Sequence, residues 1–88
     1  MTKRQILKEI QHCAEMESYF HAKVIRTPIE DCEDDLKIEL HYNKKLQELV
    51  ETAGKMGIPE KEIDEATFMG RDDACEVIVE ADDNGWWD

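Results

Sequence analysis

Between Leu36 and Tyr42 the sequence alternates strictly between apolar and polar residues. Side chains of a β-strand point alternately to opposite faces, so this period of two is typical of a half-buried strand. A helix through the same segment would need its apolar stripe to shift sideways near residue 42. We therefore predict a strand over 36–42. The preceding Thr27-Pro28-Ile29-Glu30 is a capping box with proline at the first helical position, which predicts a short helical turn over 28–34.

Two other segments show the three- to four-residue spacing of an amphipathic helix. The first covers residues 3–20, and Thr2 can cap its N-terminus. Its apolar stripe consists of Ile6, Ile10, Cys13 and Phe20. The second covers residues 44–56 and is followed by Gly57, a residue type that commonly ends helices. Its stripe consists of Leu46, Leu49, Val50, Ala53 and Met56.

The last third of the chain gives mixed signals. Pro59 predicts the start of a short helix over 59–67, and Gly70-Arg71-Asp72-Asp73 predicts a turn. The β-branched run inside 75–81 favours a strand, although Asp73 and Glu76 also fit a capping box. Asn84-Gly85 predicts a tight turn. The interpretation is an α+β fold in one domain, residues 1–88, with an all-α helical bundle as the alternative.

Charge is distributed unevenly along the 88 residues. Asp and Glu number 22 against 11 Lys and Arg, which gives a net charge of −11. Residues 1–29 are slightly basic, and the whole acidic excess lies in residues 30–88. Nucleic acids and anionic membranes are themselves negatively charged, so this excess argues against both as direct partners. A basic protein surface is the partner that the charge favours.

Composition also narrows the location and the chemistry that we expect. No apolar run is long enough for a membrane span, and the N-terminus lacks the apolar region of a secretory signal. Three cysteines, Cys13, Cys32 and Cys75, do not form a regular disulfide pattern, which predicts reduced thiols in the cytoplasm. Nucleotide-binding loops, hydrolase motifs and metal-ligand spacings do not occur. We expect no enzyme activity, no cofactor and no metal.

The acids themselves form the candidate partner-binding site. Those at i, i+2 on a strand lie about 6.7 Å apart and those at i, i+4 on a helix about 6 Å apart. Alternate phosphates of a DNA strand have a similar spacing, about 6.8 Å along the axis. Two tryptophans at the chain end are added as potential interface anchors. The predicted partner-binding residues are Glu30, Asp31, Glu33, Asp34, Asp35, Glu39, Asp72, Asp73, Glu76, Glu80, Asp82, Asp83, Trp86 and Trp87.

In size, acidity and lack of catalytic motifs, residues 30–88 resemble small phage-encoded DNA-mimic and host-takeover proteins. These include inhibitors of the nucleoid protein HU, anti-restriction proteins and some anti-CRISPR proteins. The resemblance implies inhibition of a basic DNA-binding protein by occupation of its DNA-binding surface, often by a homodimer. The slightly basic first helix departs from a uniformly acidic mimic and is interpreted as a core or dimerisation element.

Two other functions remain open at this point. The chain fits an immunity protein or antitoxin that neutralises a basic toxin such as a nuclease, in which case Trp86 and Trp87 would dominate the contact. It also fits a generic acidic interaction domain, because negative charge by itself keeps proteins soluble.

Overall fold

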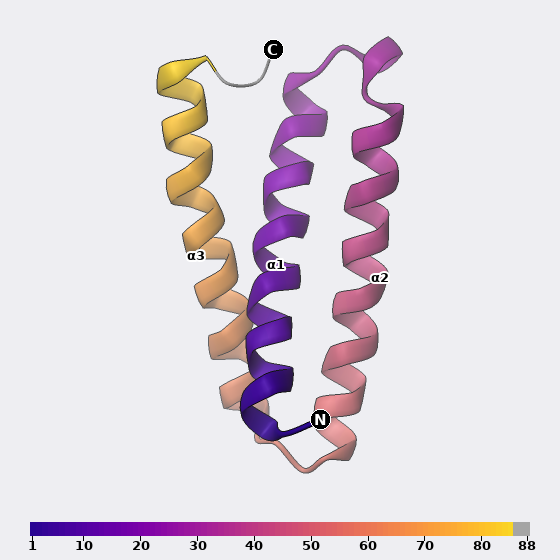
Figure 1. Ribbon diagram of the computed structural model, residues 1–88, viewed down its shortest axis with the longest axis vertical. Coiled ribbons are helices and arrows are strands. Elements are labelled where there is room, and N and C mark those ends of the chain that lie inside the picture. The colour runs from indigo at the N-terminus through magenta and orange to yellow at the C-terminus, as the bar shows by residue number, and fades with distance from the viewer. Residues whose placement is uncertain (86–88) are drawn as a thin grey trace.

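The computed structural model describes residues 1–85 and contains three long helices (Figure 1). They are α1 (Lys3–Arg26), α2 (Glu33–Lys55) and α3 (Glu60–Asn84), and a single 3-10 turn, η1 (Ile29–Asp31), lies between the first two. No strand occurs within the described range. The α+β prediction is therefore wrong, and the fold is the helical bundle that stood as its alternative.

The alternating segment 36–42 belongs to α2, not to a strand. Leu36, Ile38 and Leu40 are all exposed, and Tyr42 alone of the four packs against the core. Neither proline nor glycine interrupts residues 33–53, and the acidic first turn of α2 matches the positive end of its dipole. The alternation thus places apolar side chains on different sides of one uninterrupted helix, and the predicted helix 44–56 is its second half.

The segment 75–81, also predicted as a strand, lies within α3, as do the predicted turn 70–73 and the short helix 59–67. After Ile63, the buried side of α3 is formed by small residues at helical spacing, among them Gly70, Ala74 and Ala81. Packing of this side against α1 outweighs the strand preference of the β-branched run at 77–79, because tertiary contacts override local propensity.

Local signals account for where the helices start and stop. Thr2 caps α1, since its hydroxyl accepts from the Gln5 backbone N–H at 3.2 Å while the Gln5 side chain accepts from the Thr2 N–H at 2.8 Å. Gly57 (φ 81°) turns the chain between α2 and α3, and Gly85 (φ 68°) ends α3. Asn84-Gly85 is therefore a helix C-terminus and not the tight turn expected from the sequence.

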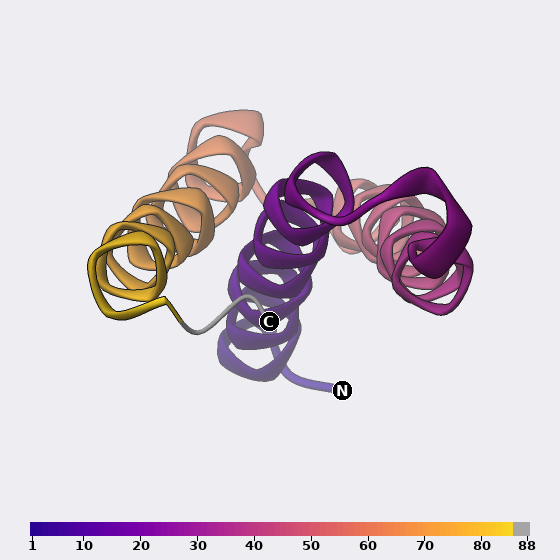
Figure 2. The same cartoon turned by 90° about the horizontal axis from the view of Figure 1, so that it is seen from above.

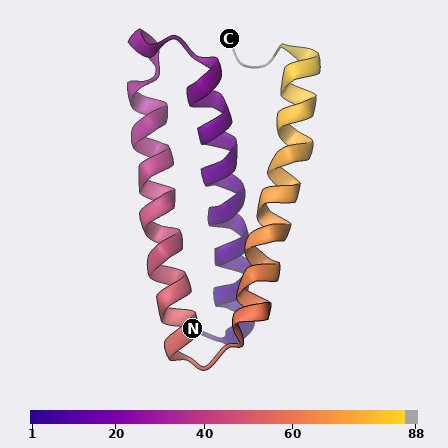
Figure 3. The same cartoon turned by 180° about the vertical axis from the view of Figure 1, so that it is seen from behind.

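The bundle is open rather than triangular along its length. α1 lies between the other two helices and packs against both, whereas α2 and α3 scarcely touch (Figure 2). α1 and α3 run in the same direction and α2 runs opposite, as Figure 3 shows from behind. The fully buried side chains of α1, Ile6, Ile10 and Cys13, meet Leu46, Leu49 and Ala53 of α2 and Ile63 and Ala66 of α3. Leu46, Leu49 and Ala53 agree with the predicted stripe, while Val50 and Met56 are exposed.

Candidate protein-binding surface

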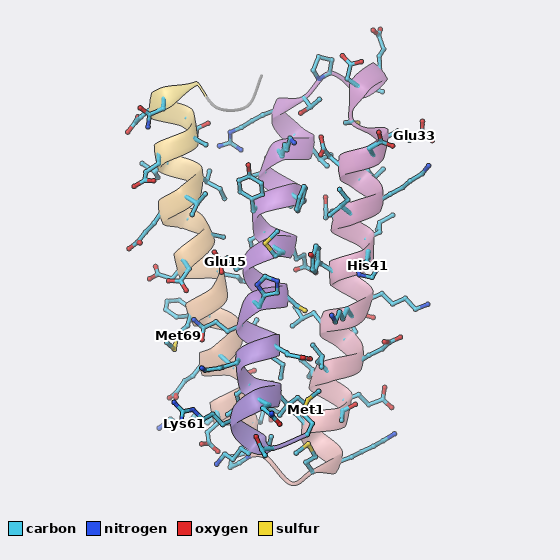
Figure 4. All side chains as sticks on the ribbon, viewed as in Figure 1. Met1, Glu15, Glu33, His41, Lys61 and Met69 are labelled. Atoms are coloured by element: carbon cyan, nitrogen blue, oxygen red, sulfur yellow. The ribbon has the colours of Figure 1, made fainter. Side chains whose placement is uncertain are left out.

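Some of the predicted acidic residues lie at one end of the bundle. η1 and the start of α2 lie at the same end as the last turn of α3, although about 50 residues separate them in sequence (Figure 1). Glu33 marks this end in Figure 4. The end of α1, with Lys23 and Arg26, stands between the two acidic segments. Because α3 runs opposite to α2, its last turn lies at the same end as the start of α2, and charges that are far apart in the sequence share this end.

Two of the predicted residues face inward and hold α2 against α1. Asp35 lies 3.3 Å from the Lys23 ammonium, and Glu39 lies 3.1 Å from Nδ1 of His21. Their side chains are only 15% and 18% exposed. Asp35 and Glu39 were predicted to bind a partner, and that stays a prediction; in the fold both carboxylates pair with side chains of α1.

Two more of the predicted residues join α3 to α1. The Gln11 amide donates to Asp73 at 3.1 Å. Arg26 donates to both oxygens of Asp82, at 2.8 and 3.0 Å, and its Nη1 also donates to the Ala22 carbonyl. The hydrogen bonds that Arg26 donates to Asp82 raise the pKa of Arg26, since the carboxylate favours the charged guanidinium. Asp73 and Asp82 thus act within the fold.

The remaining acids at this end are exposed and form what we call the acidic pole: Glu30, Asp31, Glu33, Asp34 and Asp83. Only Glu33 has an ionic neighbour, Lys37 one helical turn away at 3.4 Å. Among residues 1–85 the other four carboxylates make no ion pair or hydrogen bond. These carboxylates are available to a cation outside the chain.

The two halves of the acidic pole differ in what they do for their own helices. Acids in the first turn of α2 stabilise it, because the N-terminal end of a helix is positive. Asp82 and Asp83 stand in the last turn of α3, where the helix end is negative and no basic residue of α3 compensates. Arg26 of α1 offsets the charge of Asp82. Helix stability therefore explains Glu33, Asp34 and Asp35 but not Asp83.

A second exposed group, the α3 stripe, consists of Asp72, Glu76 and Glu80. Four-residue spacing places successive carboxylates on one side of the helix, about 6 Å apart along its axis. None of the three carboxylates forms an ion pair or a hydrogen bond with a residue in the range 1–85. The spacing that was predicted for acids on a helix is therefore found in α3.

The cysteines and histidines do not assemble into a reactive site in the described part of the chain. Cys13 is buried, and burial is the main reason that the pKa of its thiol is raised, which disfavours the reactive thiolate. Cys32 Sγ lies 3.4 Å from the Ile29 carbonyl, and Cys75 is exposed. No group of three or more potential metal ligands occurs among residues 1–85.

One surface was missed by the sequence reasoning. A groove between the first halves of α1 and α3 is floored by Leu7, Ala66 and Met69 and bordered by Arg4 and Lys8. Met69 and neighbouring Phe68 are 52% and 70% exposed, and Figure 4 shows Met69 on the outer side of α3. The sequence offered one signal for this groove, the cations Arg4 and Lys8 four residues apart in the first helix. Phe68 and Met69 gave no such signal, because they precede the segment 70–73 that was predicted to be a turn.

Trp86 and Trp87, the predicted anchors, lie outside the described residues. Within the described range, no helix combines the length and the apolar character that crossing a membrane requires. Comparison with known proteins finds no matching family model, no significantly similar curated protein and no significantly similar solved structure.

Proposed function

We propose that this chain is a cytoplasmic binding protein that inhibits a basic nucleic-acid-binding protein by presenting carboxylates where DNA presents phosphates. The partner is a protein whose DNA-binding surface is rich in Lys and Arg, for example a nucleoid protein such as HU or a defence nuclease. The chain contributes binding and no catalytic step, and it does not itself contact nucleic acid.

One observation carries the proposal. The fold brings Glu30, Asp31, Glu33 and Asp34 to the same end as Asp83, and four of these five carboxylates have no partner within residues 1–85. Acids that merely keep a protein soluble gain nothing from standing at the negative end of a helix, where each one costs about 0.3–1 kcal/mol. Asp83 destabilises the end of α3 in this way, and a cationic partner bound to its carboxylate would offset that destabilisation.

Spacing adds a second argument. Carboxylates of the α3 stripe recur at about 6 Å, close to the roughly 6.8 Å between alternate phosphates of one DNA strand. A groove whose Lys and Arg side chains are arranged for a phosphate backbone can therefore meet several of these carboxylates at once. Association through such contacts is fast and weakens as salt screens the charges.

Competition with DNA tests the proposal. A labelled duplex is bound to HU or to a basic nuclease, the chain is added, and fluorescence anisotropy follows displacement of the duplex at about 50 and about 200 mM salt. We expect displacement at the lower salt concentration and clearly weaker binding of the chain, measured directly by calorimetry, at the higher one. Binding that hardly changes between the two salt concentrations would contradict charge mimicry.

A matched pair of variants locates the surface. Asp34→Asn/Asp83→Asn removes two carboxylates of the acidic pole, whereas Glu48→Gln/Asp64→Asn removes two exposed carboxylates elsewhere on the helices. Both double variants change the net charge by the same amount. We expect the first to lose affinity and the second to compete nearly as well as the unaltered chain. Equal loss in both would mean that total charge, and not the acidic pole, governs binding.

A further inference from the structure

The groove between the first halves of α1 and α3 has the form of a docking surface. It encloses about 460 Å³, and its floor is apolar, formed by Leu7, Ala66 and Met69. Phe68 extends the apolar area onto the outer side of α3. Large side chains as exposed as Phe68 and Met69, grouped beside a hollow, mark a contact site more often than isolated exposed residues do.

Charge defines what this groove can accept. Lys3 is neutralised by Glu62 at 2.8 Å. Arg4 and Lys8 line the same groove, and neither forms an ion pair or a side-chain hydrogen bond with any residue from 1 to 85. The groove is also lined by Glu65, whose carboxylate forms no ion pair or hydrogen bond among residues 1–85. Two unpaired cations, Arg4 and Lys8, thus stand against one unpaired carboxylate, Glu65, and this balance favours an anionic occupant.

The anionic counterpart lies on the same side of the molecule. Along α3, Met69 of the groove shares a side with Glu76 and Glu80, since offsets of seven and eleven residues return to nearly the same direction on a helix. Because α1 and α3 run parallel, Arg4 and Lys8 stand at one end of this face and Glu76 and Glu80 at the other. Met69 lies between the two charged pairs.

Such a face is complementary to itself. A twofold axis near Met69 would turn a second copy antiparallel and bring its acidic pair opposite the basic pair of the first copy, and the reverse. The spacing matches, because both pairs are four residues apart on a helix, about 6 Å. We propose that two copies of this chain form an antiparallel dimer in which Arg4 and Lys8 of each copy bind Glu76 and Glu80 of the other around a centre of Met69 and Phe68.

The second copy satisfies the groove better than a free anion does. It supplies two carboxylates at the required spacing and, with its own Phe68 and Met69, apolar surface to cover those of the first copy. Four residues of the acidic pole, Glu30, Asp31, Glu33 and Asp34, belong to η1 and α2 and lie outside this face, whereas Asp83 follows Glu80 on the same side of α3.

Charge exchange provides the test. Light scattering after size-exclusion chromatography, over a concentration series from micromolar to millimolar, should show the unaltered chain approaching twice its mass of 10.3 kDa. Arg4→Glu/Lys8→Glu and Glu76→Lys/Glu80→Lys should each be monomeric, because each homodimer would oppose like charges. An equimolar mixture of the two variants should form a heterodimer, since both of its contacts then pair opposite charges.

Controls separate the proposed contact from general effects. Lys37→Glu/Lys44→Glu changes the net charge by the same amount as Arg4→Glu/Lys8→Glu, but on α2, and should leave the dimer intact. Circular dichroism should show unchanged helix content in all variants. An unaltered chain that stays monomeric at the highest concentration overturns the proposal, as does failure of the two charge-exchanged variants to associate when mixed. Either result is obtained without any basic partner protein, so it leaves the acidic-pole proposal untouched.

Discussion

Gly70 of α3 lies so close to Gln11 of α1 that no side chain fits between the two helices at this point. A Cβ atom on Gly70 would overlap the Gln11 carbonyl oxygen and approach the Ala14 Cβ to 2.9 Å. Because the contacted atoms belong to backbone and to a buried alanine, they cannot move aside as the end of a flexible side chain can. Gly70 thus sets the distance between α1 and α3.

Gly70→Ala should therefore lower the free energy of unfolding by about 1–3 kcal/mol, the usual cost of overpacking a core. Urea denaturation followed by circular dichroism measures the change. Gly54→Ala is the matched control, since a Cβ on Gly54 meets nothing within 4 Å and alanine favours the helix by about 0.5–1 kcal/mol. If both substitutions stabilise the protein, the close contact between Gly70 of α3 and Gln11 of α1 is contradicted.

The contact between Arg26 and Asp82 should act as a pair. Arg26→Gln and Asp82→Asn each break a two-bonded contact between the ends of α1 and α3, and each should lower the urea midpoint slightly. The double variant should lose little more than either single variant, because the same interaction is removed only once. Effects that simply add would show that the two residues contribute separately. High salt should reduce the difference between the unaltered chain and the variants.

The three thiols should differ in reactivity according to their burial. Cys75 is exposed and should react first with a thiol reagent at mildly alkaline pH, followed by the partly buried Cys32. Cys13 should react only when the chain unfolds, because burial both shields its thiol and raises its pKa. Mass spectrometry of partly labelled protein with and without urea gives the order. Rapid labelling of Cys13 in the folded chain would contradict the described core.

The raised pKa of Cys13 also predicts a pH dependence of stability. A folded-state pKa above the unfolded one means that the folded chain holds this proton more tightly. The stabilisation is complete below the unfolded pKa, about 8.5, and is lost as the pH rises toward the folded pKa. The difference in unfolding free energy between the unaltered chain and Cys13→Ala should shrink as urea denaturation is moved above about pH 8.5. A difference that grows with pH would contradict the assigned shift.

Phe20 and Tyr42 should be energetically coupled across α1 and α2. Their rings are stacked with centroids 6.3 Å apart and planes 11° from parallel. In a double-mutant cycle with Phe20→Ala and Tyr42→Ala, the coupling should be about 0.5–1.5 kcal/mol. Tyr42→Phe keeps the ring and should preserve the coupling. Zero coupling would argue against the register in which α2 packs on α1.

The sequence could predict the helices whose apolar stripe coincides with the core. Ile6, Ile10 and Cys13 have regular spacing and are fully buried, so the first helix was found with its cap at Thr2. In the segments 36–42 and 75–81 the apolar residues of the pattern are not the residues that the fold buries. Leu40 is 58% exposed, and within 75–81 the buried residue is Ala81 and not one of the β-branched residues at 77–79.

The sequence similarly placed the acidic excess but could not sort its members. Asp34 and Asp35 are neighbours, yet only Asp35 meets a lysine of α1. The same holds for Asp82 and Asp83, of which Asp82 meets Arg26. In each pair, the acid that faces inward is the one whose side chain points toward α1. That direction depends on how α2 and α3 pack against α1 and not on the local sequence.

By itself the sequence determined the net charge, the acidic excess after residue 29 and the amphipathic stripes of residues 3–20 and 44–56, because these depend on composition and on spacing within one segment. Tertiary structure alone decided that segments 36–42 and 75–81 are helical and that Gly70 is an interhelical contact. It also decided which carboxylates remain free at the acidic pole. The physical reason is that α1 offers apolar and cationic surface to α2 and α3 at once, and contacts between distant segments outweigh the local preferences that the sequence displays.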